Sequence, residues 1–415
     1  MAPVVHTGSG RIRGMPEEGV LAFRGIPYAQ LPIGPLRFRP PHKPVAWDGV
    51  RDAHTYGPAP MQGDNPFTQP SLALSERSED CLSLNVWTPA TDDARRPVLV
   101  WLHGGAFLFE DGSRPLFNGA RLAARGDVVV VTLNYRLGLF GFLRGKGICR
   151  DGLDSTGNEG ILDQMAALEW VRDEIAGFGG DPHHVTVCGQ SAGAGSAALL
   201  TIMPQARGLV HKVIQQSGGV VLRHTPETAD RVMRRLLAGA GLTPAQAGQL
   251  RAMPAAALLD LQQRVTPRTG SVFYQPVADG DLIPADPFAA VAEGASRGIP
   301  LLCGTTLDEM KFFRAIDPAV DTLDEAGLLA AAAPSCPTQA KPSASSRHIV
   351  PRGRHVGRTP RRQSSGLPSP ATTGTALRPY ADDLCLPLRL ALASEWWPAG
   401  RGPRHGDPVH LRPAR

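Results

Sequence analysis

The chain has 415 residues, of which 42% are hydrophobic and 20% are charged, as in ordinary soluble globular proteins of one large domain or two smaller ones. No stretch reaches the ~20 unbroken apolar residues of a membrane helix, and the N-terminus has no basic region followed by an apolar run. We therefore expect a cytoplasmic protein without a secretory signal or a membrane segment.

The net charge of +5 is distributed unevenly along the chain. Residues 334–415 contain 13 Lys and Arg against 4 Asp and Glu, so the basic character belongs to this tail. The same 82 residues contain 13 prolines, no phenylalanine and one isoleucine, without a sustained period of 2 or 3.6. We predict an incomplete folded domain over residues 1–333, followed by a tail over 334–415 that is either disordered or frameshifted.

Apolar runs and helical spacing alternate through the middle of the folded part. Buried strands are predicted at Pro97–Leu102, Val128–Leu133 and Val185–Cys188, and helices at Asp163–Ile175 and Ala192–Leu200. Such alternation predicts an α/β fold with a mostly parallel central sheet and helices on both faces.

Three further segments extend this pattern. Val4–Thr7 has the composition of a strand at the start of the chain, and residues 226–264 are helical in pattern, which predicts an excursion beside the sheet. Gly298–Cys303 begins another predicted buried strand. The six cysteines show no zinc spacing, so we expect reduced thiols, no metal and no cofactor, with Cys188 and Cys303 as small core residues.

The pentapeptide Gly189-Gln190-Ser191-Ala192-Gly193 lies between a predicted strand and a predicted helix. A G-x-S-x-G turn in this context is typical of a nucleophile elbow, where small neighbours allow a tight turn that projects the serine hydroxyl. The Ala192 N–H at the start of the helix can then stabilise an oxyanion. A chance glycine-rich turn is the alternative, which the flanking strand and helix disfavour.

Two more segments follow predicted strands. His103-Gly104-Gly105-Ala106 comes directly after Pro97–Leu102, and its glycines would let two backbone N–H groups face a substrate oxygen. We expect His103 itself to be structural. Glu309 follows the strand that begins at Gly298, which fits the order of serine, then acid, then histidine, although a solvated carboxylate is the plain alternative.

Together with other segments, these residues resemble the type-B carboxylesterases, the family that includes bacterial para-nitrobenzyl esterases and cholinesterases. The likeness runs from about residue 4 to about residue 330. The further segments that carry it are FRGIPYAQLPIGPLRF (Phe23–Phe38), SEDCLSLNVW (Ser78–Trp87), NYRLGLFGF (Asn134–Phe142), GNEGILDQ (Gly157–Gln164), FGGDP (Phe178–Pro182), QSG (Gln216–Gly218) and PVADG (Pro276–Gly280).

The resemblance implies an α/β-hydrolase fold whose C-terminal part is missing here, and hydrolysis of a small-molecule ester through an acyl-serine intermediate. It implies Ser191 as nucleophile and Glu309, rather than Asp308, as the acid of the triad. The oxyanion donors would be Gly104, Gly105 and Ala192. Ser217 matches a serine that lies just behind the triad. The identity of the ester and the oligomeric state stay open.

The general base that serine needs is missing from the matched region. In the family this histidine lies in a motif like H-G-x-E-I-P-F-x-F after an aromatic strand. His405, in His405-Gly406-Asp407-Pro408, has a faint likeness to it but lacks the aromatic strand. The triad histidine is therefore unassigned, with His405 as the candidate that the chain offers.

A shifted reading frame would explain this absence. With suitable GC-rich codons, Trp396–Leu411 shifted by one base reads Gly-Gly-Arg-Leu-Gly-Ala-Gly-His-Gly-Met-Glu-Ile-Pro-Phe-Thr-Phe, which is the family's histidine motif. The same shift can produce an aromatic strand from Leu384–Ser394. Without a base, this exact chain would be a poorly folding, inactive product.

The sequence leaves two other functions to consider. A catalytically dead binding protein, as among the adhesion relatives of cholinesterases, is kept as an alternative because the histidine is missing, although those proteins typically lack the serine. Nucleic-acid binding by the basic tail is disfavoured, because no aromatic residues are interleaved with its arginines to stack on bases. We expect no nucleic-acid or membrane partner.

Overall fold

A computed structural model describes residues 3–64, 76–149, 153–266 and 273–309. The chain divides into two units, Met1–Glu309 and Met310–Arg415, and all the described residues belong to the first. The domain boundary predicted at residue 333, the tail that follows it and His405 lie outside the described residues.

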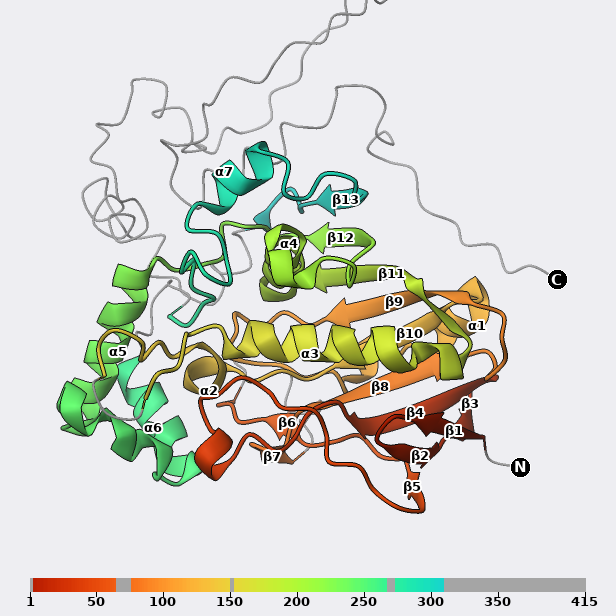
Figure 1. Cartoon of the computed structure of the whole chain (residues 1–415), viewed down its shortest axis with the longest axis horizontal. Helices are drawn as coiled ribbons and strands as arrows, with labels where there is room; N and C mark the ends of the chain where they lie inside the picture. Colours follow the sequence, from red (N-terminus) through yellow and green to blue (C-terminus); the bar gives the residue numbers. More distant parts are fainter. Residues whose placement is uncertain (1–2, 65–75, 150–152, 267–272, 310–415) are drawn as a thin grey trace, which may run out of the picture. The chain divides into compact units, whose positions relative to one another are not determined.

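An eight-stranded mixed sheet forms the centre of the first unit, in the order β13-β12-β11-β9-β10-β8-β4-β3 (Figure 1). Its strands are β3 (Met15–Glu17), β4 (Val20–Pro27), β8 (Ser83–Thr88), β9 (Arg96–Leu102), β10 (Val129–Leu133), β11 (Gly180–Gln190), β12 (Lys212–Gln216) and β13 (Leu301–Gly304). All pairings from β10 to β13 are parallel, as expected for the mostly parallel sheet predicted from the sequence. The pairings from β3 to β10 are antiparallel and were not predicted.

Two small sheets accompany the central one. β1 (Val4–Thr7), β2 (Gly10–Arg13) and β5 (Val50–Asp52) form a three-stranded sheet, and β6 (Ala59–Pro60) pairs with β7 (Arg77–Ser78). The predicted N-terminal strand is therefore present as β1.

Helices cover both faces of the central sheet. The helices are α1 (Ala120–Gly126), α2 (Gly138–Phe142), α3 (Glu159–Glu174), α4 (Ala192–Ile202), α5 (Pro226–Ala240), α6 (Ala255–Val265) and α7 (Pro287–Ala292). Short 3₁₀ turns lie at Gly34–Leu36, Pro115–Phe117, Ile175–Phe178, Pro204–Ala206 and Pro244–Arg251. Trp87 packs with Ala120 of α1, whereas the adjacent Val86 belongs to the main core with Leu168 of α3. Because successive side chains of a strand point to opposite faces, α1 and α3 cover opposite sides.

The helical excursion predicted over residues 226–264 is α5, the 3₁₀ turn Pro244–Arg251 and α6. Thr225 caps α5 by accepting a hydrogen bond from the Thr228 N–H, and Gly241 ends it with a left-handed φ of 67°. The buried face of α5 includes Met233 and Leu236 at helical spacing. Figure 1 shows α5 and α6 together at one end of the unit, beside α2.

β13 corrects one expectation. The strand predicted from Gly298 is present, but Leu301 and Leu302 are 56% and 62% exposed rather than buried. β13 pairs with β12 on one side, and none of the described strands lies along its other edge, so this strand is the edge of the described sheet. Cys303 is therefore exposed and is not a core residue, whereas Cys188 is buried as predicted. Among the described residues, no helix combines the length and apolarity that crossing a bilayer requires.

Candidate active site

Ser191 lies at the junction between β11 and α4, in a backbone conformation that few serines adopt. Its φ is 53° and its ψ is −118°, outside the regions favoured by residues with a side chain. Two backbone hydrogen bonds hold this turn: the Ser191 N–H donates to the Gln216 carbonyl, and the Gly195 N–H donates to the Ser191 carbonyl, both at 2.9 Å. A strained residue that the surroundings hold so firmly is typical of a functional turn.

The glycines on either side of Ser191 are required by close backbone approach. A Cβ added to Gly189 would lie 2.3 Å from the Gly193 carbonyl carbon. A Cβ added to Gly193 would lie 2.0 Å from the Leu102 carbonyl oxygen, at the end of β9. Neither site has room for a side chain, so the G-x-S-x-G spacing follows from how β9, β11 and α4 meet.

The loop after β9 folds tightly against this turn. A Cβ on Gly104 would lie 2.6 Å from Gln190 Oε1 and 3.4 Å from Ser191 Cβ. Gly105 has a φ of 95°, and its carbonyl accepts hydrogen bonds from the N–H groups of Leu108 and Phe109, both at 2.9 Å. The structure therefore brings the glycines of this loop to the serine that the sequence singled out.

Ala192 is the first residue of α4. The N–H groups in the first turn of a helix have no intrahelical acceptor, and they carry the positive end of the helix dipole. Together with the loop glycines, the Ala192 N–H can face a negatively charged oxygen beside Ser191.

His103 is fully buried, and its contacts support the structural role predicted for it. Its Nδ1–H donates to the Gly104 carbonyl at 3.0 Å, and its ring stacks on Tyr135 with the centroids 4.4 Å apart. The Tyr135 hydroxyl donates to the His103 carbonyl at 2.8 Å. Burial lowers the pKa of His103, which favours the neutral imidazole.

Ser217 and Gly218 lie beneath the turn. Ser217 has a φ of 55°, and its N–H donates to the Gly304 carbonyl at 2.8 Å. A Cβ on Gly218 would lie 2.4 Å from the Ser191 carbonyl oxygen. The sequence analysis identified Ser217 but not the role of Gly218. A glycine directly after Ser217 indicates that the backbone passes close to a neighbouring segment.

Glu309 lies in the turn that follows β13. Its Oε1 accepts a hydrogen bond from the Thr306 N–H at 2.7 Å. The hydrogen bonds Ser191–Gln216 and Ser217–Gly304 join the ends of β11, β12 and β13 in sequence. Ser191 and Glu309 therefore both lie beyond the carboxyl ends of the parallel strands, at the edge of the sheet where α/β proteins place their ligands.

The described residues do not supply a base at this site. None of their histidines hydrogen-bonds Ser191 or Glu309. The described part of the chain also contains no group of three or more His, Cys, Asp or Glu that could hold a metal ion.

Comparisons with known proteins agree with this geometry. The profile of the carboxylesterase family matches residues 1–329. The para-nitrobenzyl esterase of Bacillus subtilis (strain 168) is 44% identical over 330 residues, covering 78% of this chain and 67% of that protein. The phenmedipham hydrolase of Pseudarthrobacter oxydans is 38% identical over 331 residues, covering 78% of this chain and 64% of that protein.

Solved structures give the same result. The crystal structure of the Geobacillus stearothermophilus carboxylesterase EST55 at pH 6.2 has 45% sequence identity and a TM-score of 0.73. The match covers 79% of this chain and 66% of that one. The expected α/β-hydrolase fold is confirmed, and the chain spans about two thirds or less of the length of these three relatives.

Proposed function

The chain belongs to the carboxylesterase family, and from this premise we propose that it is a serine carboxylesterase acting on small-molecule carboxylic esters. The observation that carries the proposal is Ser191, held at a φ of 53° between β11 and α4 with Gly104 packed against it. A serine in this position is exposed to an ester carbonyl at the edge of the sheet.

The proposed reaction has two steps. Ser191 Oγ attacks the ester carbonyl carbon while a base takes its proton, and the N–H groups of Gly104, Gly105 and Ala192 stabilise the oxyanion. The carbon–oxygen bond of the ester then breaks, and the proton passes to the leaving alcohol. Water, deprotonated by the same base, attacks the acyl carbon of the acyl-serine. The bond to Ser191 Oγ breaks, the base returns the proton to that oxygen, and the acid leaves, with Glu309 orienting the base throughout.

This reaction needs a base, and in the family that base is a histidine. We propose that residues after about 333 are read in a shifted frame and that the family's histidine lies in the other frame. The end of the family match at residue 329 supports this. Sequencing the DNA across codons 325–345 tests it: a missing or extra base supports an intact triad in the corrected chain, whereas a confirmed frame removes the shift and leaves His405 as the remaining candidate.

Turnover of a para-nitrobenzyl ester tests the function, since one relative carries that substrate in its name. With the corrected frame, we expect turnover that falls on the order of 10⁶-fold in Ser191→Ala. Ser9→Ala, in the turn between β1 and β2, should leave the rate unchanged. Equal rates for wild type and Ser191→Ala would refute the mechanism.

With a confirmed frame and no turnover, the catalytically dead binding protein or a degenerate gene product would become the better interpretation. The cytoplasmic location also stays a prediction, which fractionation of cells that express the chain would test.

A further inference from the structure

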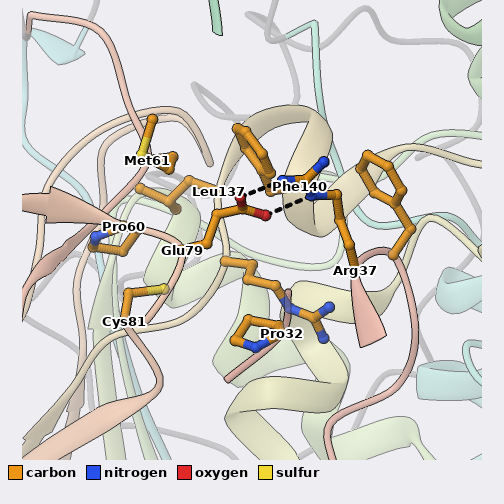
Figure 2. A pocket seen from close by; sticks show the side chains of 10 residues that line it. Pro32, Arg37, Pro60, Met61, Glu79, Cys81, Leu137 and Phe140 are labelled. Carbon is orange, nitrogen blue, oxygen red and sulfur yellow. Dashed lines mark hydrogen bonds and ion pairs between the residues drawn. The ribbon is translucent and has the colours of Figure 1, made fainter. Parts of the chain in front are cut away.

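The helical excursion, residues 226–265, is fastened to the core by Arg37. The Arg37 guanidinium pairs with Glu79, with Nε–Oε1 at 2.7 Å and Nη2–Oε2 at 2.5 Å. Its Nη1 donates to the carbonyls of Arg251 and Met253, both at 2.6 Å, in the segment that joins the 3₁₀ turn to α6. Figure 2 shows this ion pair beside Leu137, the N-cap of α2, and Phe140, in the first turn of that helix.

A second attachment is made by Gln262, which is only 4% exposed on α6. Its Oε1 accepts a hydrogen bond from the Leu139 N–H at 2.7 Å, at the N-terminus of α2. A Cβ on the neighbouring Gly138, whose φ is 53°, would lie 2.1 Å from the same oxygen. The amide of Gln262 therefore occupies the space that a side chain at position 138 would need.

The first turn of α2 in turn holds the oxyanion loop, residues 103–110. The Gly138 N–H donates to the Phe107 carbonyl at 2.7 Å. The Phe107 ring is fully buried and packs on Phe142, with the centroids 4.9 Å apart. Two residues beyond Phe107, the Phe109 N–H donates to the carbonyl of Gly105, one of the proposed oxyanion donors.

This loop needs external support. Ala106 and Phe107 are consecutive non-glycine residues with left-handed φ values of 57° and 58°. Residues with a Cβ avoid this conformation unless their surroundings impose it. The hydrogen bond from Gly138 to the Phe107 carbonyl is one of the contacts that impose it, and the position of Gly138 depends on Gln262.

We propose that Gln262 is a positioning residue for the oxyanion loop, acting through the first turn of α2. It joins the helical excursion to the loop that carries the proposed oxyanion donors, through the hydrogen bonds Leu139–Gln262 and Gly138–Phe107. The catalytic part of this inference rests on the proposed esterase function. The structural part, that Gln262 holds residues 103–110, does not.

The matched variants are Gln262→Met and Gln263→Met. Methionine keeps the length of the side chain but lacks the acceptor for Leu139, and Gln263 is the exposed neighbour on the same helix. We expect Gln262→Met to lower kcat about 10-fold with KM within about twofold, because a displaced donor acts mainly in the transition state. Gln262→Glu retains an acceptor and should restore most of the lost kcat.

Amide hydrogen exchange provides a readout that needs no turnover. Peptides covering residues 104–110 should exchange about 10-fold faster in Gln262→Met and at the wild-type rate in Gln263→Met, under conditions where both variants stay folded. Equal exchange rates in the two variants would overturn the proposal. If the wild type is active, an unchanged kcat in Gln262→Met would overturn it as well. If wild type has no turnover, the esterase function fails, and exchange alone decides whether Gln262 holds the loop.

Discussion

Gly104 lies directly against Ser191: a Cβ built on the glycine would be 3.4 Å from the Cβ of the serine. The two residues are 87 positions apart in the chain. They meet because β9 and β11 are adjacent parallel strands, in register at Trp101 with Cys188 and at Leu102 with Gly189. The loops that follow both strands therefore leave the sheet at the same edge, which brings the proposed nucleophile and the proposed oxyanion donors together.

Gly104→Ala should damage catalysis more than folding. The added methyl group would press on Gln190 and Ser191 and displace the loop donors, so in the enzyme with the corrected frame we expect kcat to fall about 10²-fold with little change in KM. Steady-state kinetics on a para-nitrobenzyl ester measures this. Gly126→Ala is the control, because its added Cβ meets Val128 at an ordinary 3.5 Å. A wild-type kcat in Gly104→Ala would contradict the assigned oxyanion loop.

Replacing Asp308 and Glu309 one at a time tests which of these two neighbouring carboxylates is the acid of the triad. In the enzyme with the corrected frame, Glu309→Gln should lower kcat by about 10⁴-fold, since the base would lose its orienting carboxylate. Asp308→Asn should stay within a few-fold of wild type. Comparable losses in both variants, or a larger loss in Asp308→Asn, would show that Glu309 is not the acid.

The buried ion pair between Arg136 and Asp163 is expected to be critical for stability. Asp163 is fully buried and accepts from Arg136 Nε at 2.7 Å and Nη2 at 2.6 Å. Asp163→Asn would leave a buried guanidinium without its counter-charge, which should lower the free energy of unfolding by about 3–5 kcal/mol. Denaturant unfolding measures this loss.

The exposed pair Arg13–Asp52 provides the matched control for that experiment. The side chains of this pair are 42% and 55% exposed. Asp52→Asn should therefore change the free energy of unfolding by no more than about 1 kcal/mol. Equal effects of Asp163→Asn and Asp52→Asn would show that burial does not set the importance of these pairs.

His224 should make the fold sensitive to acid. Burial lowers its pKa from the ordinary 6.5 to about 4, and its Nε2–H donates to the Phe273 carbonyl at 3.2 Å. Because the unfolded chain binds the proton first, stability is lost as pH falls from about 6.5 to about 4, by at most about 3 kcal/mol. His224→Gln retains a donor and should lose this dependence.

The measurement is the free energy of unfolding of wild type and His224→Gln between pH 7 and pH 4. Glu159 acts in the opposite direction, since burial raises its pKa from 4.5 to about 7 and its protonation favours the native state as pH falls. The difference between the two proteins cancels that contribution. A difference that stays constant across this range would exclude His224 as the source.

Much of the fold could be read directly from the sequence. The runs at β9, β10 and β11 and the helical spacing in α3, α4 and α5 have local causes, because apolar period and backbone conformation depend on neighbouring residues. The same holds for the turn at Ser191, where glycines two positions away on each side mark the close backbone approach. Family resemblance then supplied the roles proposed for Glu309 and Ser217.

Other features depend on residues that are distant in the chain. Leu301 and Leu302 have the pattern of a buried strand, yet their exposure depends on which strands lie beside β13. Gln262 looks like any polar residue on a helix until its amide meets Leu139, 123 positions earlier. Packing between distant segments leaves no local period or turn residue to read, so these relationships are visible only once the chain has folded.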